Sequence, residues 1–331
     1  SLASPHRQPT AHSHPQKGKS LDQSSSTRFG LGLRKPHYAA FLDGVVAVDF
    51  VEVISENFMI QGGRPRDILR RIRQNMPVAL HGVSMSLGSA EPVDRAYLQR
   101  LRALADEIEP FAISDHLCWT RSGQFNAHDL LPLPYTTESL DIICDNISRA
   151  QDALGRALLV ENPSSYISFA HSDMSEWEFI AAMCQRSGCQ LLLDVNNIYV
   201  SAVNHGFDPL EYIAGVPLHH VQQIHLAGHS QGRDLLIDTH DEPVRDHVWA
   251  LYAKALARFG PVATMVERDG HIPAFDVLVA EVARAQDRHA LGAQLELPAG
   301  LRALRDAHLR VAATDRADEV DWRHPGSARA N

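Results

Sequence analysis

Six short apolar segments of this chain each contain or end in a residue that can bind a metal ion. The segments are PVALHG, FAISDH, LLVEN, QLLLDVNN, VQQIHLAGH and ATMVERDG. One polar residue after an apolar strand carries little information, but six in succession indicate parallel strands whose carboxyl ends meet. Closed α/β barrels build their active sites at that face. The pattern therefore predicts a barrel with metal-binding side chains at its mouth.

Hydrophobic patterning between these segments supports the same architecture. Continuous apolar runs predict eight parallel strands, because such strands are buried on both faces. They cover residues 30–34, 49–55, 78–84, 111–118, 157–162, 190–197, 221–227 and 263–267. Helical periodicity predicts helices over residues 94–108, 136–154 and 247–259, the first beginning at an Asp94 cap. Eight strand-then-helix units favour a closed (β/α)8 barrel of the TIM type over an open sheet.

The two ends of the sequence differ in composition from its middle. Residues 1–28 are rich in Ser, Pro, Gln and His and lack apolar periodicity. Such a segment buries too little surface to offset its ordering entropy, so we expect a disordered polar leader. We expect residues 29–313 to form one barrel domain and residues 314–331 to form a polar tail.

Composition argues against several classes of function. A net charge of -9 disfavours nucleic-acid binding, which normally needs a basic surface. No apolar run reaches the roughly 18 residues of a membrane span. The motif GLGLR at Gly30 lacks the third glycine of a dinucleotide-binding motif, so such a site is not expected. The four cysteines form no CxxC pair, so we expect a cytoplasmic protein without a disulfide framework.

The polar residues at the strand ends are nitrogen and oxygen ligands. Imidazole, carboxylate or amide donors are offered by His81, His116, Glu161, Asp194, Asn197, His225, Asp238, His240 and Glu267. Mixed nitrogen and oxygen ligation without thiolate suits iron, manganese or zinc. Converging carboxylates repel one another unless cations bridge them, so the set predicts two or more metal ions. Asp238 and His240 would share one face of an extended loop.

Each of these residues also has a structural explanation when it is taken singly. A lone histidine at a strand end is more often hydrogen-bonded than metal-bound, and Asp or Asn there is often a helix cap. The case for metal binding therefore depends on the whole set. His128, His205 and His229 suit a ligand role and a structural role equally well. We expect Cys118 to pack in the core and His219 to lie on the surface.

Longer motifs connect the chain with a known family. They are GLGLR at Gly30, VEVISENF at Val51, LHGVSMSLGS at Leu80, SDHLCW at Ser114, LLPLPYTTESL at Leu130, VENPSSY at Val160, LLLDVNNIYVSAVNHGFDP at Leu191, IHLAGH at Ile224, DTHDEPV at Asp238 and VERDG at Val266. Over about residues 29–288 the chain resembles the multinuclear non-haem iron-dependent oxidative enzymes (MNIO family). Within that family it most resembles the branch that matures copper-binding, cysteine-rich peptides, the bufferins.

The resemblance implies a fold, a cofactor and an activity. The fold is a barrel similar to that of xylose isomerase, with two or three iron ions in mixed Fe(II) and Fe(III) states at its mouth. The activity is oxidation, with dioxygen as co-substrate, of cysteine residues in a ribosomally made precursor peptide. A partner protein often recruits that peptide. We expect neither nucleic acid nor a membrane among the partners.

The resemblance also assigns roles to residues. The implied metal ligands are His81, His116, Glu161, Asp194, Asn197, His225, Asp238, His240 and Glu267. We take Glu161, Asp194, His225 and Asp238 as the catalytic residues, with Glu161 as a bridging carboxylate. Glu56, Asn57 and Asp115 are expected to orient the histidines. The loop expected over residues 199–209 is a candidate for holding the peptide.

Two other classes of function remain open at this point. A divalent-metal sugar isomerase or phosphodiesterase on the same barrel would use similar ligands but would not need dioxygen. A non-enzymatic metal-binding or peptide-chaperone protein would bind iron without consuming oxygen. Metal analysis combined with mass spectrometry of a precursor peptide distinguishes these alternatives.

Overall fold

A computed structural model describes residues 27–44, 46–60, 62–123 and 125–294 of the chain. Eight parallel strands close into a barrel in the order β1-β12-β9-β8-β7-β4-β3-β2. Their bounds are β1 Phe29–Gly32, β2 Phe50–Ile54, β3 Val78–His81, β4 Ala112–His116, β7 Leu159–Glu161, β8 Gln190–Asp194, β9 Val221–Leu226 and β12 Ala263–Val266. The predicted closed (β/α)8 barrel is confirmed, and each predicted strand overlaps one of these strands.

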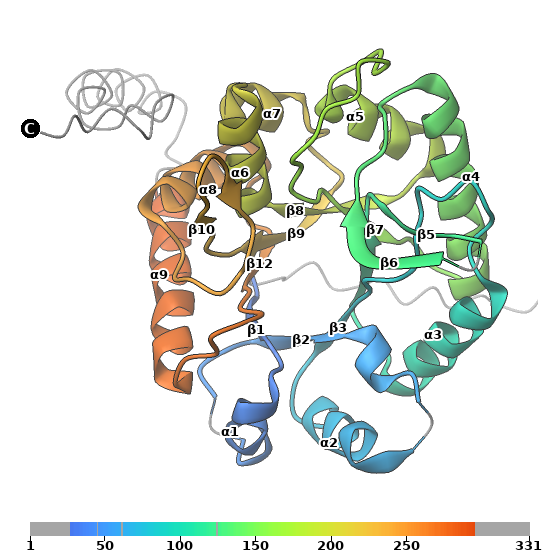
Figure 1. Cartoon of the computed structure of the whole chain (residues 1–331). Helices are drawn as coiled ribbons and strands as arrows, with labels where there is room; N and C mark the ends of the chain where they lie inside the picture. The colour runs from blue at the N-terminus through green and yellow to red at the C-terminus, as the bar shows by residue number, and fades with distance from the viewer. Residues whose placement is uncertain (1–26, 45, 61, 124, 295–331) are drawn as a thin grey trace, which may run out of the picture.

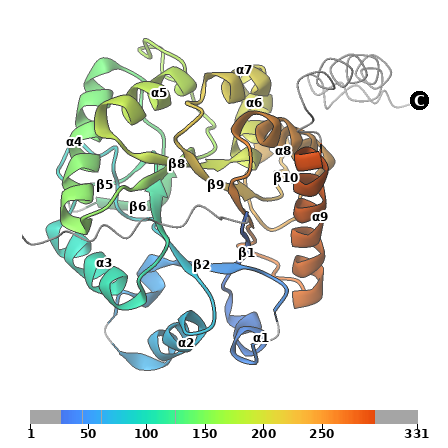
Figure 2. The same ribbon diagram turned by 180° about the vertical axis from the view of Figure 1, so that it is seen from behind.

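Helices surround the barrel on its outside (Figures 1 and 2). They are α1 Tyr38–Leu42, α2 Gly63–Arg73, α3 Arg95–Ile108, α4 Thr137–Leu154, α5 Glu176–Ser187, α6 Val195–His205, α7 Pro209–Gly215, α8 Asp246–Phe259 and α9 Phe275–Gln294. The predicted Asp94 cap is confirmed, since its Oδ1 accepts a hydrogen bond from the backbone N–H of Ala96 at 2.7 Å. No helix in the described ranges is long and apolar enough to cross a membrane.

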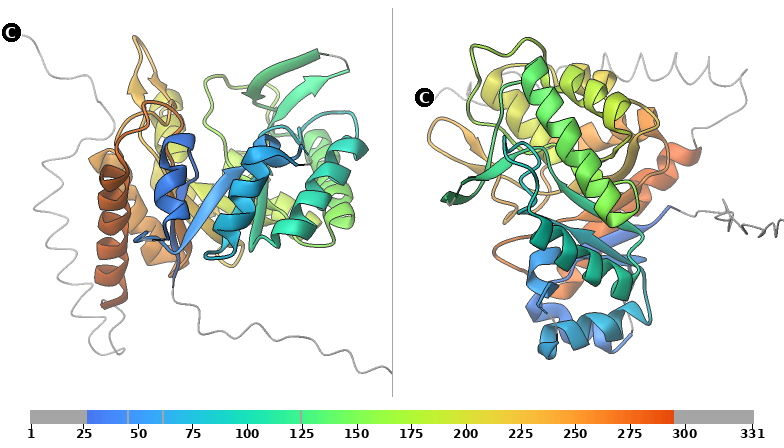
Figure 3. Two further views of the ribbon diagram at one scale, coloured as in Figure 1. Left: turned by 90° about the horizontal axis from the view of Figure 1, so that it is seen from below. Right: turned by 90° about the vertical axis from the view of Figure 1, so that its right-hand side faces the viewer.

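Two antiparallel hairpins were not predicted from the sequence. The first joins β5 Trp119–Ser122 to β6 Phe125–Leu131 after β4, and the second joins β10 Ser230–Gln231 to β11 Leu236–Ile237 after β9. Both follow the carboxyl end of a barrel strand, and both stand on the same side of the barrel (Figure 3, left). They therefore flank the mouth at which the predicted ligands were expected.

In six of the eight barrel strands, the interior side chains change from apolar to polar within two residues. One interior layer is apolar and consists of Phe50, Ala79, Ala112, Leu159, Leu192 and Met265. Residues two positions apart in a strand point to the same face. The residues two positions later are Glu52, His81, Ser114, Glu161, Asp194 and Glu267. The strand period thus places a floor of apolar side chains directly beneath a polar layer.

The glycine at position 30 has a packing role in the apolar layer. A Cβ atom added to Gly30 would lie 2.6 Å from the ring of Phe50, closer than van der Waals contact allows. Glycine in the GLGLR motif therefore gives the Phe50 ring its space inside the barrel. This explains the motif without a dinucleotide-binding role.

Two expectations around β8 are wrong. The strand expected over residues 190–197 ends at Asp194, because α6 begins at the next residue. The loop expected over residues 199–209 is mostly helical, since α6 continues to His205 and α7 begins at Pro209. The Asp194 side chain accepts a hydrogen bond from the backbone N–H of Asn197 at 2.7 Å and caps α6. Apolar runs alone do not distinguish a buried strand from a buried helix.

Several expectations concern residues outside the described ranges. The leader expected over residues 1–28 lies there except for Thr27 and Arg28. Residues 295–313 of the expected barrel domain and the tail expected over residues 314–331 also lie outside them. The barrel described above is complete within residues 29–266.

Candidate metal centre

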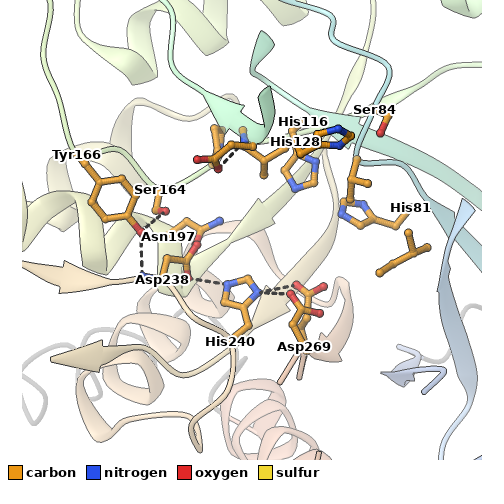
Figure 4. A pocket seen from close by; sticks show the side chains of 16 residues that line it. His81, Ser84, His116, His128, Ser164, Tyr166, Asn197, Asp238, His240 and Asp269 are labelled. Atoms are coloured by element: carbon orange, nitrogen blue, oxygen red, sulfur yellow. Dashed lines mark hydrogen bonds and ion pairs between the residues drawn. The ribbon is translucent and has the colours of Figure 1, made fainter. Parts of the chain in front are cut away.

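The carboxyl ends of the strands open into a cavity of about 340 Å³ (Figure 4). The predicted ligands in its wall are His81, His116, Asn197, Asp238, His240 and Glu267. The other three, Glu161, Asp194 and His225, are almost completely buried, with at most 1% of each residue exposed. All nine predicted ligands thus lie at or directly beneath one mouth. Their role as metal ligands remains a prediction.

A first group of donors comes from β3, β4 and β7. His81 Nε2 lies 3.3 Å from Glu161 Oε2, and His116 Nε2 lies 3.2 Å from the same oxygen. The other ring nitrogen of each histidine, Nδ1, faces away from Glu161 and has a neutral partner. His81 Nδ1 lies 2.8 Å from Ser114 Oγ, and His116 Nδ1 lies 3.1 Å from the Gly82 carbonyl oxygen. These contacts turn both Nε2 atoms toward Glu161.

A second group uses the other oxygen of Glu161. His225 Nδ1 lies 3.5 Å from Glu161 Oε1 and 3.0 Å from Glu267 Oε2. Donor atoms of these three residues and of Asp194 lie within 4.8 Å of one another. Glu161 therefore presents one oxygen to each group, the geometry expected of a carboxylate that bridges two ions.

A third group surrounds His240 (Figure 4). His240 Nε2 lies 2.7 Å from Asp238 Oδ1, while His240 Nδ1 lies 3.3 Å from Glu267 Oε2 and 3.4 Å from Asp269 Oδ2. Asp269 was not predicted as a ligand. Its position two residues after Glu267 in VERDG was the available signal, because alternate residues of an extended segment share a face.

Unsatisfied polar atoms test whether this set suits metal ions. Glu161 Oε2, Asp194 Oδ2, Asn197 Oδ1 and His225 Nδ1 are buried, and none of them makes a hydrogen bond of suitable geometry with the described residues. The contacts of Glu161 Oε2 and His225 Nδ1 given above are at ion-pair distance only. A buried polar atom left without a partner costs roughly 1–3 kcal/mol. Four such acceptors at one place fit cations that accept their lone pairs. Nitrogen and oxygen donors without thiolate suit iron or a similar divalent ion.

The electrostatics of the cluster also favour cations. Burial alone would raise the pKa of Glu161, but the three surrounding histidines lower it to about 2. Burial alone would lower the pKa values of His225 and His240, but neighbouring carboxylates raise both well above the usual value. Burial, with nearby carboxylates, raises the pKa of Asp194 well above normal. Multivalent metal ions would neutralise these carboxylates and leave the imidazoles neutral.

The carboxylates expected to orient the histidines bond backbone groups and a tyrosine instead of the imidazole rings, and Asp115 Oδ1 accepts from the backbone N–H of His116 at 2.8 Å. Glu56 Oε1 accepts hydrogen bonds from the backbone N–H of Val83 at 3.0 Å and from Tyr97 Oη at 2.7 Å. Asp115 Oδ2 accepts one from the backbone N–H of Met85 at 3.1 Å. These carboxylates hold the segment after β3, and Asn57 is exposed. The ring partners of His81 and His116 are instead the neutral groups described above.

Four other residues discussed from the sequence, His128, His205, Cys118 and His219, lie outside the three donor groups. His128 lines the cavity from β6, with a left-handed φ of 52°. His205 Nε2 contacts Ser165 Oγ at 2.8 Å. Cys118 is buried and His219 is exposed. None of these four residues belongs to the donor groups around Glu161 and Glu267.

A short polar chain supports Asp238. His229 Nδ1 lies 2.7 Å from Asn196 Oδ1, and Asn196 Nδ2 donates to Asp238 Oδ1 at 2.7 Å. Tyr166 Oη accepts a hydrogen bond from the backbone N–H of Asp238 at 2.9 Å. Figure 4 shows Tyr166 beside Asp238. Asn196 and Tyr166 were not singled out in the sequence, because a single Asn or Tyr in a long motif carries no role by itself.

Comparison with known proteins identifies the family. The family described as "RiPP precursor modification enzyme MbnB/TglH/ChrH" matches residues 28–290. The chain is 68% identical over 265 residues to a UPF0276 protein of Rhizorhabdus wittichii, covering 80% of this chain and 95% of the relative. It is 62% identical over 272 residues to a UPF0276 protein of Caulobacter vibrioides, covering 82% and 97%. The chain belongs to this family, which modifies precursors of ribosomally made peptides and is the MNIO family that its motifs resemble.

Solved structures show the same barrel in distant proteins. D-psicose 3-epimerase from Clostridium cellulolyticum H10 matches with a TM-score of 0.55 at 10% identity, covering 80% of this chain and 98% of that chain. L-ribulose 3-epimerase matches with a TM-score of 0.53 at 14% identity, covering 86% and 98%. Identities this low establish a shared fold and leave the chemistry to the site itself.

Proposed function

We propose that this protein oxidatively modifies cysteine residues of a ribosomally made precursor peptide, using dioxygen and two or three iron ions bound at the barrel mouth. The observation that carries the proposal is the sharing of carboxylates between donor groups. Glu161 belongs to the first and second groups, and Glu267 belongs to the second and third. Shared carboxylates favour adjacent ions over a single isolated one. Bound iron would supply the electron transfer to dioxygen and a Lewis acid for a thiolate.

The protein's own cysteines do not suit the role of reacting thiol. All four are buried, and none lines the cavity. Cys118 is the one nearest in sequence to a predicted ligand, and burial raises its pKa well above the usual value. A buried, protonated thiol is a poor nucleophile and a poor ligand. The thiol that is oxidised therefore comes from the substrate.

The chain's residues would act on the peptide by binding and orientation. The wall of the cavity offers His128, Asp129, Ser164 and Tyr166 as hydrogen-bonding groups above the predicted metal ligands. The catalytic set would be Glu161, Asp194, His225 and Asp238, which touch the proposed ions. A partner protein would deliver the peptide to the mouth. The proposal includes a cytoplasmic location, where precursor peptides are made, and a bufferin-type cysteine-rich peptide as substrate.

Metal analysis and peptide mass spectrometry test the proposal. Protein purified without oxygen should contain two or more irons per chain, because the donors exceed the needs of one ion. Co-expression with a cysteine-rich precursor peptide encoded beside its gene should change the peptide's mass, only with iron and dioxygen present. Turnover of a sugar by the manganese or magnesium form without dioxygen would favour the isomerase alternative.

Matched variants separate a specific loss from a damaged protein. Glu161→Gln should abolish both multinuclear iron binding and peptide modification, whereas the exposed His219→Ala variant should retain both. Iron bound without oxygen consumption or a mass change, in the presence of the precursor and any protein encoded with it, would contradict the proposal and favour a metal-binding role.

A further inference from the structure

Glu52 is a buried carboxylate outside the predicted ligand set. It lies on β2 with 3% of its surface exposed. Its Oε1 atom lies 3.0 Å from His225 Nε2, on the side of the ring opposite Glu161 and Glu267. Its Oε2 atom accepts a hydrogen bond from Gln223 Nε2. One oxygen is thus anchored by an amide, and the other faces an imidazole nitrogen.

The three buried histidines of the first two groups differ in their outer partners. His81 contacts a hydroxyl oxygen of Ser114, and His116 contacts a backbone carbonyl oxygen. His225 alone among them contacts a carboxylate on its outer side. A hydrogen bond to an ionised acceptor is roughly twice as strong as one to a neutral acceptor. The contact with Glu52 therefore holds its ring more firmly than the neutral contacts hold the other two.

We propose that Glu52 is a positioning residue, which accepts a hydrogen bond from His225 Nε2–H and so directs the lone pair of Nδ1 toward the ions shared by Glu161 and Glu267. A histidine that donates its outer N–H to a carboxylate has one fixed tautomer and a more basic ligating nitrogen. His225 becomes a stronger imidazole donor than His81 or His116. This inference rests on the metal centre of the proposed function but not on its peptide chemistry.

Gln223 completes the arrangement and provides the means to test it. Its Nε2 atom lies 3.2 Å from His225 Nε2, so positions 52 and 223 both reach the same ring nitrogen. The amide nitrogen must face Glu52, because an amide oxygen in that place would meet a carboxylate oxygen. Exchanging the two residue types would move the charge to the other side of Nε2 while keeping one carboxylate and one amide in the barrel.

Cobalt binding to the metal-free protein tests the proposal independently of peptide oxidation. Glu52→Gln preserves size, and it should weaken Co(II) affinity about 10–100-fold in chelator competition and alter the visible spectrum of the cobalt form. The exchange variant Glu52→Gln with Gln223→Glu should recover most of that affinity. Glu176→Gln, which removes a buried carboxylate elsewhere in the fold, is the matched control and should bind like wild type.

Two results would overturn the proposal. One is unchanged cobalt affinity in Glu52→Gln. The other is an exchange variant as weak as the single variant when both unfold at the wild-type temperature without metal. Glu52→Asp keeps the charge but withdraws it from Nε2, so it should also bind weakly and serves if Glu52→Gln does not fold. Wild-type cobalt binding without peptide modification would count against the proposed function and leave this inference intact.

Discussion

Two interior layers of the same barrel strands serve opposite purposes. The apolar layer contains Leu159, Leu192 and Met265, which pack against one another inside the barrel. Two residues further along, Glu161, Asp194 and Glu267 are equally buried but have carboxyl groups. In these strands, a residue that packs in the core is followed two positions later by a residue of the candidate site. The comparison shows that one strand can stabilise the fold and build the site without conflict.

Burial of the two layers also has opposite effects on the stability of the fold. Burying apolar surface stabilises the fold by roughly 25 cal/mol per Å². Burying charged groups costs several kcal/mol per ion after relaxation, unless good partners compensate. Glu161 Oε2 and Asp194 Oδ2 lack hydrogen-bond partners among the described residues. Metal binding would therefore offset the cost of the polar layer, while the apolar layer needs no such help.

The largest effect is expected in the polar layer. Glu161→Gln removes the charge that the first and second donor groups share, so multinuclear metal binding should be lost almost completely. The metal-free variant should remain folded, since the apolar layer is untouched. Iron analysis after anaerobic reconstitution and circular dichroism check both points. Retention of two irons per chain would show that Glu161 does not bridge. His219→Ala, at an exposed position, is the control.

A change in the apolar layer should have the reverse outcome. Leu192 is completely buried two residues before Asp194. Leu192→Ala removes packed atoms and leaves a cavity, so the free energy of unfolding should fall by about 2–5 kcal/mol. The folded fraction should still bind metal with wild-type stoichiometry. Urea unfolding of the metal-free protein gives the first quantity, and metal titration gives the second. Lost stoichiometry in the folded variant would mean that the two layers are not separable.

The apolar layer and its fold were largely predictable from the sequence. Parallel barrel strands are buried on both faces, so they appear as continuous apolar runs that end abruptly at polar residues. The boundary after Asp194 was wrong because α6 follows β8 directly and its first residues are also buried, so no exposed linker separates them. The hairpins at the mouth left no comparable signal. Strands β10 and β11 have only two residues each, and β6 is largely exposed and has no continuous apolar run.

The polar layer was predictable only as a set of residue types. The motifs placed nine candidate ligands at strand ends, and the structure brings them to one cavity. Glu52 was missed because its contacts depend on closure of the barrel. Its partner Gln223, for example, lies 171 positions away in the sequence. Asp115, by contrast, sits beside a ligand in sequence but holds a backbone segment. Neighbours of a metal centre are defined by three-dimensional packing, so sequence adjacency is a poor guide to them.

A buried carboxylate outside both layers can be compared with the carboxylates of the polar layer. Glu176, at the start of α5, accepts a hydrogen bond from Tyr212 Oη at 2.7 Å and belongs to none of the donor groups described above. Burial raises the pKa of Glu176 to about 7, although hydrogen bonds from Tyr212 and Tyr135 act in the opposite direction. Below that pH, a bound proton neutralises the Glu176 carboxylate. In the polar layer, histidines and the proposed metal ions would compensate the charge of the carboxylates instead.

Protonation of Glu176 makes its stability contribution depend on pH in a defined direction. Its folded-state pKa is raised, so the contribution is fully present below the unfolded value near 4.5 and is lost as pH rises through about 7. Relative to Glu176→Gln, the metal-free wild type should lose about 3 kcal/mol of unfolding free energy between these values, at 1.36 kcal/mol per pKa unit. Urea unfolding of both proteins across this range measures the difference. Parallel pH profiles would show that Glu176 is already ionised in the fold, and that buried carboxylates outside the polar layer do not require a proton.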